Sequence, residues 1–206
     1  MQASEARESI TGLVLAGGRS RRMAGADKGL LEIGGRPMVE YVLDAIVPQV
    51  GPLLVNANRN LERYAGYGYR VVPDTREGYL GPLAGVLSAL AVLETEYLLA
   101  VPCDSPLLAR DLGERLLAAL LERRADVAVA HDGRRRQPAF LLLRRGLEAD
   151  LGEYLDGGGR SIDGWLARCR IADTDLSDRP ECFVNVNDPA ERACAEALLH
   201  SKVAAP

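Results

Sequence analysis

Short apolar runs alternate with helix-like apolar stripes over the first 125 residues of the chain. The runs are four to six residues long and stop at glycine, asparagine or proline, which predicts buried strands at residues 11–16, 52–56, 69–72 and 97–101. Between them, apolar positions recur at close to helical spacing, which predicts helices at residues 37–50, 82–93 and 108–124. This alternation predicts an α/β fold with a doubly wound, mostly parallel sheet.

The second half of the chain has a less regular pattern. Two apolar segments, residues 126–131 and 138–143, flank Asp132-Gly133 and predict an antiparallel pair of strands. Further predictions are helices at residues 146–154, 162–168 and 189–199 and a last strand at residues 182–186. The sheet is therefore expected to be mixed. Residues 1–10 are expected to form a flexible tail, and residues 11–206 a single domain with halves 11–125 and 126–206.

Charge and composition exclude several classes of protein. The net charge is −4, so no bulk basic field indicates nucleic acid or an anionic membrane as a partner. No apolar run approaches the ~20 residues that cross a bilayer, and the first residues do not resemble a secretory signal. The four cysteines show neither a C-x-x-C pair nor zinc spacing. Reduced thiols in a cytoplasmic protein are the expectation.

Candidate chemistry gathers where the predicted parallel strands end. Gly17, Asn56, Asp74 and Asp104 each lie at or just after the end of a predicted strand. Ligands of open α/β sheets bind outside the carboxyl ends of the strands. The sequence therefore predicts a binding site at this edge.

The glycine pair after the first strand is the strongest single signal. Gly17-Gly18 allows a sharp turn and a close approach of backbone N–H groups to a phosphate. A group of cations follows: Arg19, Arg21, Arg22 and Lys28. The loop matches neither the Walker A pattern nor the dinucleotide fingerprint, and the competing interpretation is a plain turn with solvated arginines. We favour a polyanion site because so many cations so close to a strand end exceed what solubility requires.

Asp104 lies at the end of the predicted fourth strand and is a candidate ligand for Mg²⁺, which is commonly held by one or two carboxylates together with phosphate and water. The alternative is that it caps the following helix, a role that Ser105 or Asp111 could also fill. The neighbouring Cys103 has no histidine partner in the sequence pattern, so a buried structural thiol is expected there.

Amide side chains are candidates for recognising a base, a ribose or a second substrate. Asn56 can both donate and accept hydrogen bonds, and Asp74 can accept from base N–H groups; both could equally be ordinary turn residues. Asn185 and Asn187 alternate, so they would face one side of the predicted last strand. Capping of the last helix is the alternative role for Asn187.

The motifs occur in a recognisable order from about Thr11 to about Pro189: LAGGRSRRM, DKGLL, VNANR, GPLAG, PCDSP and VNVNDP. Together they closely resemble those of the molybdenum cofactor guanylyltransferases. The LAGG, RM and K elements alone are shared by many nucleotidyltransferases. The combination with NANR, GPLAG, PCD and the asparagine-rich segment is much more specific. One departure is Ala24, which stands where that family often has glycine.

The resemblance implies a Rossmann-like nucleotidyltransferase fold and transfer of GMP from GTP to molybdopterin, with Mg²⁺ as the cofactor and pyrophosphate as the second product. Residues 11–125 would bind the nucleotide and residues 126–206 the second substrate. The GTP-binding positions implied by the motifs are Leu15, Ala16, Gly17, Lys28, Asn56, Asp74 and Asp104. Asp104 would also hold Mg²⁺, and Asn185 and Asn187 are similar to a segment on the pterin side or near the metal.

Three groups are the expected catalytic residues: Lys28, Arg22 and Asp104. They would stabilise charge during in-line attack by the terminal phosphate of molybdopterin on the α-phosphorus of GTP. Two enzymatic alternatives are a molybdopterin cytidylyltransferase, which more often carries LAAG where this chain has Gly17-Gly18, and a sugar-phosphate nucleotidyltransferase. A non-catalytic nucleotide-binding adaptor is a third. A monomer with transient contacts to cofactor-handling proteins is expected.

Overall fold

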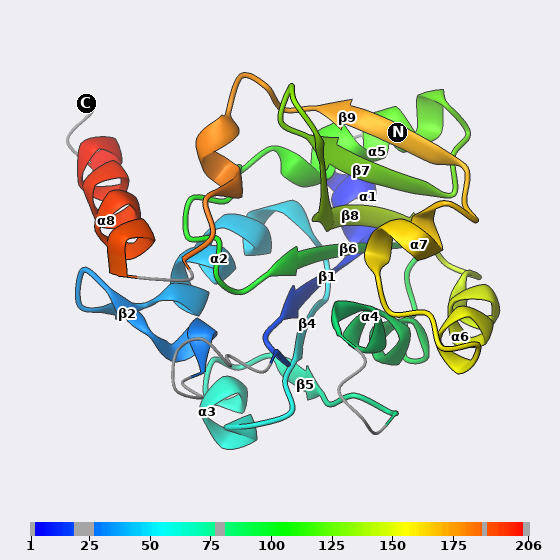
Figure 1. Ribbon diagram of the computed structural model, residues 1–206, viewed down its shortest axis with the longest axis horizontal. Helices are drawn as coiled ribbons and strands as arrows, with labels where there is room; N and C mark the ends of the chain where they lie inside the picture. Colours follow the sequence, from blue (N-terminus) through cyan, green and yellow to red (C-terminus); the bar gives the residue numbers. More distant parts are fainter. Residues whose placement is uncertain (1–2, 19–26, 77–80, 187–188, 204–206) are drawn as a thin grey trace.

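A central sheet organises the computed structural model, which describes residues 3–18, 27–76, 81–186 and 189–203. Its strands are β1 (Ile10–Leu15), β4 (Leu53–Asn56), β5 (Arg70–Val72), β6 (Tyr97–Pro102), β7 (Val127–His131), β8 (Arg136–Arg144) and β9 (Ile171–Asp175). The seven strands lie in the order β5-β4-β1-β6-β8-β7-β9 (Figure 1).

The pairing confirms the predicted mixed sheet. β5, β4, β1 and β6 run parallel, whereas β8 is antiparallel to both β6 and β7. Leu15 pairs with Asn56 on one side and with Pro102 on the other. Asn56 in turn pairs with Val72. The carboxyl ends of the four parallel strands are therefore level with one another, at one edge of the sheet.

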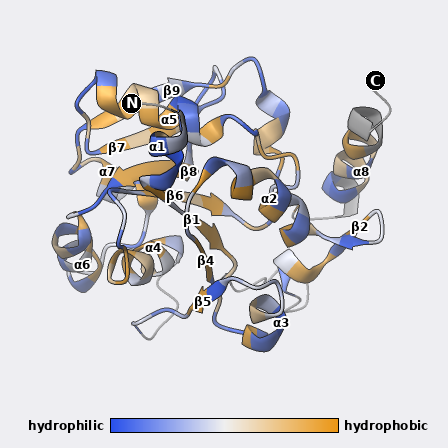
Figure 2. Ribbon diagram, turned by 180° about the vertical axis from the view of Figure 1, so that it is seen from behind, coloured by the Kyte–Doolittle hydropathy of each residue, from blue (hydrophilic) through white to orange (hydrophobic). Residues whose placement is uncertain are grey.

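Helices cover both faces of this sheet or lie beside it. They are α1 (Ala3–Glu8), α2 (Met38–Ile46), α3 (Leu61–Ala65), α4 (Pro82–Leu90), α5 (Leu112–Glu122), α6 (Glu148–Asp156), α7 (Ile162–Leu166) and α8 (Pro189–Val203), with 3₁₀ turns η2 (Lys28–Leu30), η3 (Val47–Gln49) and η4 (Pro180–Phe183). Successive residues of β1 point to opposite faces. Val14 packs in the core with α2 and α5, and Leu13 in the core with α4, α6 and α7. Figure 2 shows the apolar strands lying between helices that carry both apolar and polar residues.

The amino-terminal segment differs from the sequence prediction. Where a flexible tail was expected, Ala3–Glu8 forms helix α1. Arg7 ties it to the body, because its Nε donates to the carbonyl oxygen of Val50 at 2.8 Å. Ser9, which follows the helix, caps it by donating from Oγ to the carbonyl oxygen of Ala6. Hydrogen bonds can thus order a polar segment, and the apolar pattern of the sequence does not predict them.

Two predictions for the second half of the chain are wrong. Residues 182–186 do not form a strand: Pro180–Phe183 is a 3₁₀ turn, and an irregular segment follows it. The apolar side chains there reflect burial rather than pairing, since Cys182 and Val186 are both 1% exposed. The apolar pattern also does not predict β9, an edge strand parallel to β7 with alternating buried and exposed residues and only two apolar positions.

A small hairpin and the last helix flank the site side of the sheet. β2 (Glu32–Ile33) and β3 (Arg36–Pro37) pair across Gly34 and Gly35, whose φ angles of 58° and 78° favour glycine in this tight turn. Helix α8 lies beside β2 (Figure 1) and joins a small apolar cluster with Ile33 and Met38. None of the helices within the described ranges is long and apolar enough to cross a membrane.

Candidate functional site

Four of the predicted site residues lie at the edge where the parallel strands end. Gly17 and Asp104 both stand two residues beyond the paired positions Leu15 and Pro102 of adjacent strands. Asn56 ends β4, and Asp74 follows β5 by two residues. The structure therefore places these residues together, as the strand pattern predicts. Leu15 and Ala16 lead into the same edge from β1.

The residues nearest β4 and β5 form what we call the amide–carboxylate cluster, made of Asn56, Asn58 and Asp74. Nδ2 of Asn56 donates to Oδ1 of Asp74 at 2.9 Å and to the carbonyl oxygen of Val72 at 3.0 Å. Nδ2 of Asn58 donates to Oδ2 of Asp74 at 2.8 Å. Each oxygen of the Asp74 carboxylate therefore accepts one amide hydrogen bond, so its orientation is fixed.

Two glycines make room for this cluster. A Cβ atom on Gly17 would lie 2.7 Å from Nδ2 of Asn58 and 2.8 Å from Oδ1 of Asn56. A Cβ on Gly85, inside α4, would lie 2.3 Å from Oδ1 of Asn56. Only glycine lets the backbone approach the amides this closely. Gly81, which precedes α4, has a φ of 83°, so the start of the GPLAG segment also requires glycine.

At the other side of the edge, Lys28 and Asp104 form an ion pair. Nζ of Lys28 lies 3.0 Å from Oδ2 of Asp104, and the two side chains are 25% and 13% exposed. Helix α5 begins only at Leu112, which removes the alternative that Asp104 caps it. The carboxylate is thus held next to a cation at a partly open position.

A divalent cation fits the chemistry of this position. No group of three or more side chains able to hold a metal occurs in the part of the chain that the structure describes. A metal bound to Asp104 would therefore not be held by three such side chains of the described residues, and substrate phosphate oxygens and water would supply further ligands. This is the usual manner of Mg²⁺, which binds through one or two carboxylates and substrate phosphates.

The turn that carries Lys28 is anchored by residues that the sequence did not single out. Oδ1 of Asp27 accepts from the hydroxyl of Tyr64 at 2.6 Å, and its Oδ2 accepts from Nδ2 of Asn60 at 2.9 Å. Tyr64 is fully buried, and burial together with nearby Cys103 and Asp27 raises the pKa of its phenol. These contacts join residues more than 30 positions apart, so no local pattern indicates them.

Cys103 is a buried neighbour of the site, as predicted. Its side chain packs against Gly29, where an added Cβ would lie 3.2 Å from Sγ. Burial and the adjacent Asp104 raise the pKa of its thiol well above the usual value. Burial of this kind favours the protonated thiol and is typical of a structural cysteine rather than a nucleophile.

The asparagine-rich segment reaches the site without forming a strand. The backbone N–H of Val186 donates to the carbonyl oxygen of Asp104 at 3.1 Å, and the hydroxyl of buried Ser105 donates to Oδ1 of Asn185. Asn185 is therefore adjacent to the metal-ligand candidate. The prediction that Asn185 and Asn187 share one face of a strand is wrong, because no strand is present at Asn185.

Several predicted residues lie outside the described residues. They are Asn187, the loop arginines Arg19, Arg21 and Arg22, and Ala24. Their roles stay predictions.

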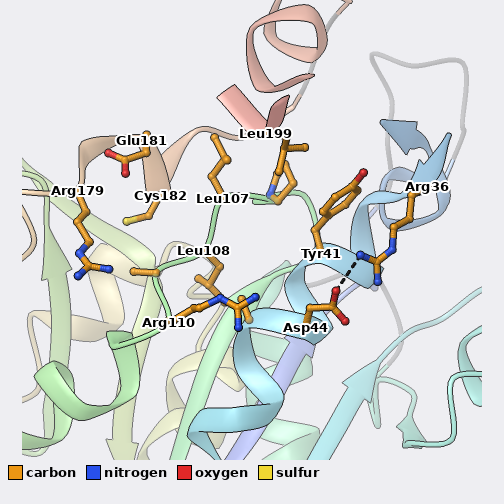
Figure 3. A pocket seen from close by; sticks show the side chains of 13 residues that line it. Arg36, Tyr41, Asp44, Leu107, Leu108, Arg110, Arg179, Glu181, Cys182 and Leu199 are labelled. Atoms are coloured by element: carbon orange, nitrogen blue, oxygen red, sulfur yellow. Dashed lines mark hydrogen bonds and ion pairs between the residues drawn. The ribbon is translucent and has the colours of Figure 1, made fainter. Parts of the chain in front are cut away.

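A separate hollow lies on the face formed by α2, residues 106–110 and η4 (Figure 3). Its volume is about 450 Å³, and Arg36, Tyr41 and Asp44 line one end while Arg179 and Glu181 line the other. None of the predicted nucleotide-binding residues lines it. The guanidinium groups at both ends are paired with acidic side chains, Arg36 with Asp44 and Arg179 with Asp111 among them. We therefore place the chemistry at the strand ends.

Known proteins of similar sequence span most of the length of this chain. Residues 12–169 match the family model described as a MobA-like NTP transferase domain. A molybdenum cofactor guanylyltransferase of Shewanella sediminis is 50% identical over 183 residues, covering 89% of this chain and 93% of the relative. One of Shewanella loihica is 48% identical over 192 residues, covering 93% of this chain and 98% of the relative.

Solved structures share the fold at lower identity. Molybdopterin-guanine dinucleotide biosynthesis protein A from Archaeoglobus fulgidus superposes with a TM-score of 0.79 at 20% identity, covering 93% of this chain and 99% of that one. The 2-C-methyl-D-erythritol 4-phosphate cytidylyltransferase from Thermus thermophilus gives 0.68 at 18%, covering 91% and 98%. The architecture is thus shared by proteins whose names refer to different nucleotides.

Proposed function

The chain belongs to the MobA-like NTP transferase family, and on that premise we propose that it transfers GMP from GTP to molybdopterin, forming the guanine dinucleotide form of the cofactor and releasing pyrophosphate. The relatives of about 50% identity over most of the chain carry the name of this activity. The observation that supports it in the structure is the convergence of Gly17, the amide–carboxylate cluster and the Lys28–Asp104 pair at one edge of the sheet.

The guanine base is assigned to the amide–carboxylate cluster. Guanine presents two neighbouring donors, N1–H and the 2-amino group, and a carboxylate offers two acceptor oxygens. Asp74 has both of its oxygens held in place by amides and retains further lone pairs on each. Adenine would present an unprotonated ring nitrogen to the same carboxylate, and this would be repelled.

The transfer itself needs little proton chemistry. The terminal phosphate of molybdopterin is anionic, so it attacks the α-phosphorus of GTP without a general base. A new P–O bond forms while the bond to the bridging oxygen of the β-phosphate breaks, and pyrophosphate leaves. Positioning and neutralisation of negative charge must therefore supply most of the rate.

The residues of the edge supply that neutralisation. The ammonium group of Lys28 and the backbone N–H groups at Gly17-Gly18 stabilise the charge that develops on the departing pyrophosphate. Arg22 is proposed to assist them. Because Asp104 holds Lys28 before substrate arrives, the cation needs little reorganisation during the reaction.

Asp104 is also the residue proposed to hold Mg²⁺. When bound, the ion would neutralise phosphate charge and act as a Lewis acid. Asn185, held by Ser105 beside Asp104, is proposed to contact the second substrate, with Asn187. All four cysteines are free thiols, which supports a reducing compartment such as the cytoplasm, and we propose that the enzyme acts there as a monomer.

A product assay tests the proposed function. The purified chain is incubated with molybdopterin, Mg²⁺ and either GTP or CTP, and pyrophosphate and the dinucleotide product are measured. We expect kcat/KM for GTP to exceed that for CTP by at least about 100-fold, because the wrong base leaves buried polar groups unpaired. EDTA should abolish turnover and excess Mg²⁺ should restore it. Equal use of CTP, or no pyrophosphate from GTP, would contradict the proposal.

A further inference from the structure

Asn58 links the ends of three strands through its side chain. Its Nδ2 donates to Oδ2 of Asp74 at 2.8 Å and to the carbonyl oxygen of Gly17 at 3.3 Å, and its Oδ1 accepts from the backbone N–H of Asp74 at 2.8 Å. Gly17 follows β1, Asn58 follows β4 and Asp74 follows β5. One amide therefore fixes the backbone and the carboxylate of Asp74 together.

Its neighbour Asn56 has a different environment. Asn56 is 3% exposed, and its amide also binds the carbonyl oxygen of Val72 within the sheet. Asn58 is only half-buried and contacts no strand residue through these hydrogen bonds. We therefore expect that replacing Asn58 changes the strand ends and leaves the hydrogen bonds within the sheet in place.

We propose that Asn58 is a positioning residue for base selection: it orients the Asp74 carboxylate so that this group accepts from the N1–H and 2-amino groups of guanine. The inference rests on the proposed function, because it requires that GTP binds at this edge. Without Asn58, the carboxylate of Asp74 keeps only the hydrogen bond from Asn56 and loses both its second amide donor and the backbone tie to residue 58, so its orientation is less restrained. Loss of Asn58 should therefore weaken nucleotide binding, seen as a higher KM for GTP, more than it slows the transfer step, seen as kcat.

Comparison of GTP with ITP, which lacks only the 2-amino group, measures this role. In Asn58→Ala we expect the KM for GTP to rise about tenfold while kcat changes less than about threefold, since a binding contact is lost. The ratio of kcat/KM for GTP to kcat/KM for ITP should be lower in Asn58→Ala than in the wild type and should equal the ratio found for Asp74→Asn. In the Asp74→Asn background, Asn58→Ala should change KM less than about twofold, because the two substitutions remove the same interaction.

The variant Asn58→Asp has nearly the same shape as the wild type, so its effect on GTP binding does not arise from a cavity or from misfolding. Asn58→Asp places a second carboxylate against Asp74, so it should raise the KM for GTP more than Asn58→Ala does. Combining Asn58→Asp with Asp74→Asn should lower the KM for GTP below that of Asn58→Asp alone. In the double variant the amide at position 74 donates to the carboxylate at position 58, so the repulsion between two carboxylates is removed. Arg63→Ala, on the exposed side of α3, is the control and should leave both substrates unaffected. Thermal unfolding reports whether each variant is folded.

Two results would overturn the inference. One is a loss confined to kcat with an unchanged GTP-to-ITP ratio, and the other is an Asn58→Ala effect that adds fully to that of Asp74→Asn. Calorimetric binding of GTP and ITP to the wild type and Asn58→Ala gives the same comparison without turnover. Failure of the product assay would therefore contradict the proposed function while this binding measurement still decides the role of Asn58.

Discussion

Substituting Asp104 by Asn should reduce turnover by at least about 1000-fold while the protein remains folded. The substitution removes the only charge on that side chain and with it the proposed metal ligand, and electrostatic stabilisation supplies most of the rate in reactions of this kind. The Lys28–Asp104 pair is partly exposed, with side chains 25% and 13% accessible, so its loss should cost only ~1 kcal/mol of unfolding free energy. Pyrophosphate release and thermal unfolding measure the two effects.

Asp126→Asn is the matched control for this substitution. Asp126 also pairs with a cation, Arg170, and its side chain is 25% exposed, but it lies before β7, away from the strand ends that form the site. We expect its turnover to match that of the wild type. If Asp104→Asn kept wild-type turnover under limiting Mg²⁺, the assignment of the metal ligand would be wrong.

Replacing Gly85 by Ala should weaken GTP binding by about 100-fold and lower the free energy of unfolding by about 2 kcal/mol, as overpacking of a buried site does. The new methyl group would lie 2.3 Å from Oδ1 and 2.6 Å from Cγ of Asn56, and 2.9 Å from Cδ2 of Leu15. Asn56 must move, and its hydrogen bond to Asp74 is then lost. Calorimetric titration with GTP and chemical denaturation measure the two consequences.

Gly152→Ala is the control for the backbone part of that effect. Gly152 lies inside α6 as Gly85 lies inside α4, but the nearest atom to its added Cβ is a guanidinium nitrogen of Arg76 at 3.4 Å. Alanine is favoured over glycine in a helix interior by ~1 kcal/mol, so this variant should be equally or more stable and bind GTP normally. Equal GTP affinity in both variants would show that Gly85 does not constrain the cluster.

Much of the site could be predicted because parallel strands end at one edge. The positions of Gly17, Asn56, Asp74 and Asp104 follow from apolar runs that stop at glycine, asparagine or proline. The register of β1 with β4 and β6, and of β4 with β5, confirms that these strands end at one edge. Even Asn58 had a readable signal, since it stands two residues after Asn56 on the same segment.

Other parts depend on contacts that no local pattern records. The anchoring of Asp27 by Tyr64 joins residues 37 positions apart, and its geometry exists only once α3 packs against the Lys28 turn. Strand β9 was missed because an edge strand buries only alternate residues, here Ala172 and Thr174. The segment at Asn185 was misread because burial of apolar residues does not require pairing.

A structure of the chain with Mg²⁺ and a non-hydrolysable GTP analogue tests the proposed nucleotide site directly. We expect the triphosphate to lie between the backbone of Gly17-Gly18 and the Lys28–Asp104 pair, with the guanine edge on Asp74. Nucleotide bound elsewhere, such as in the hollow between Tyr41 and Arg179, with Asp104 making no contact to metal or phosphate, would contradict it.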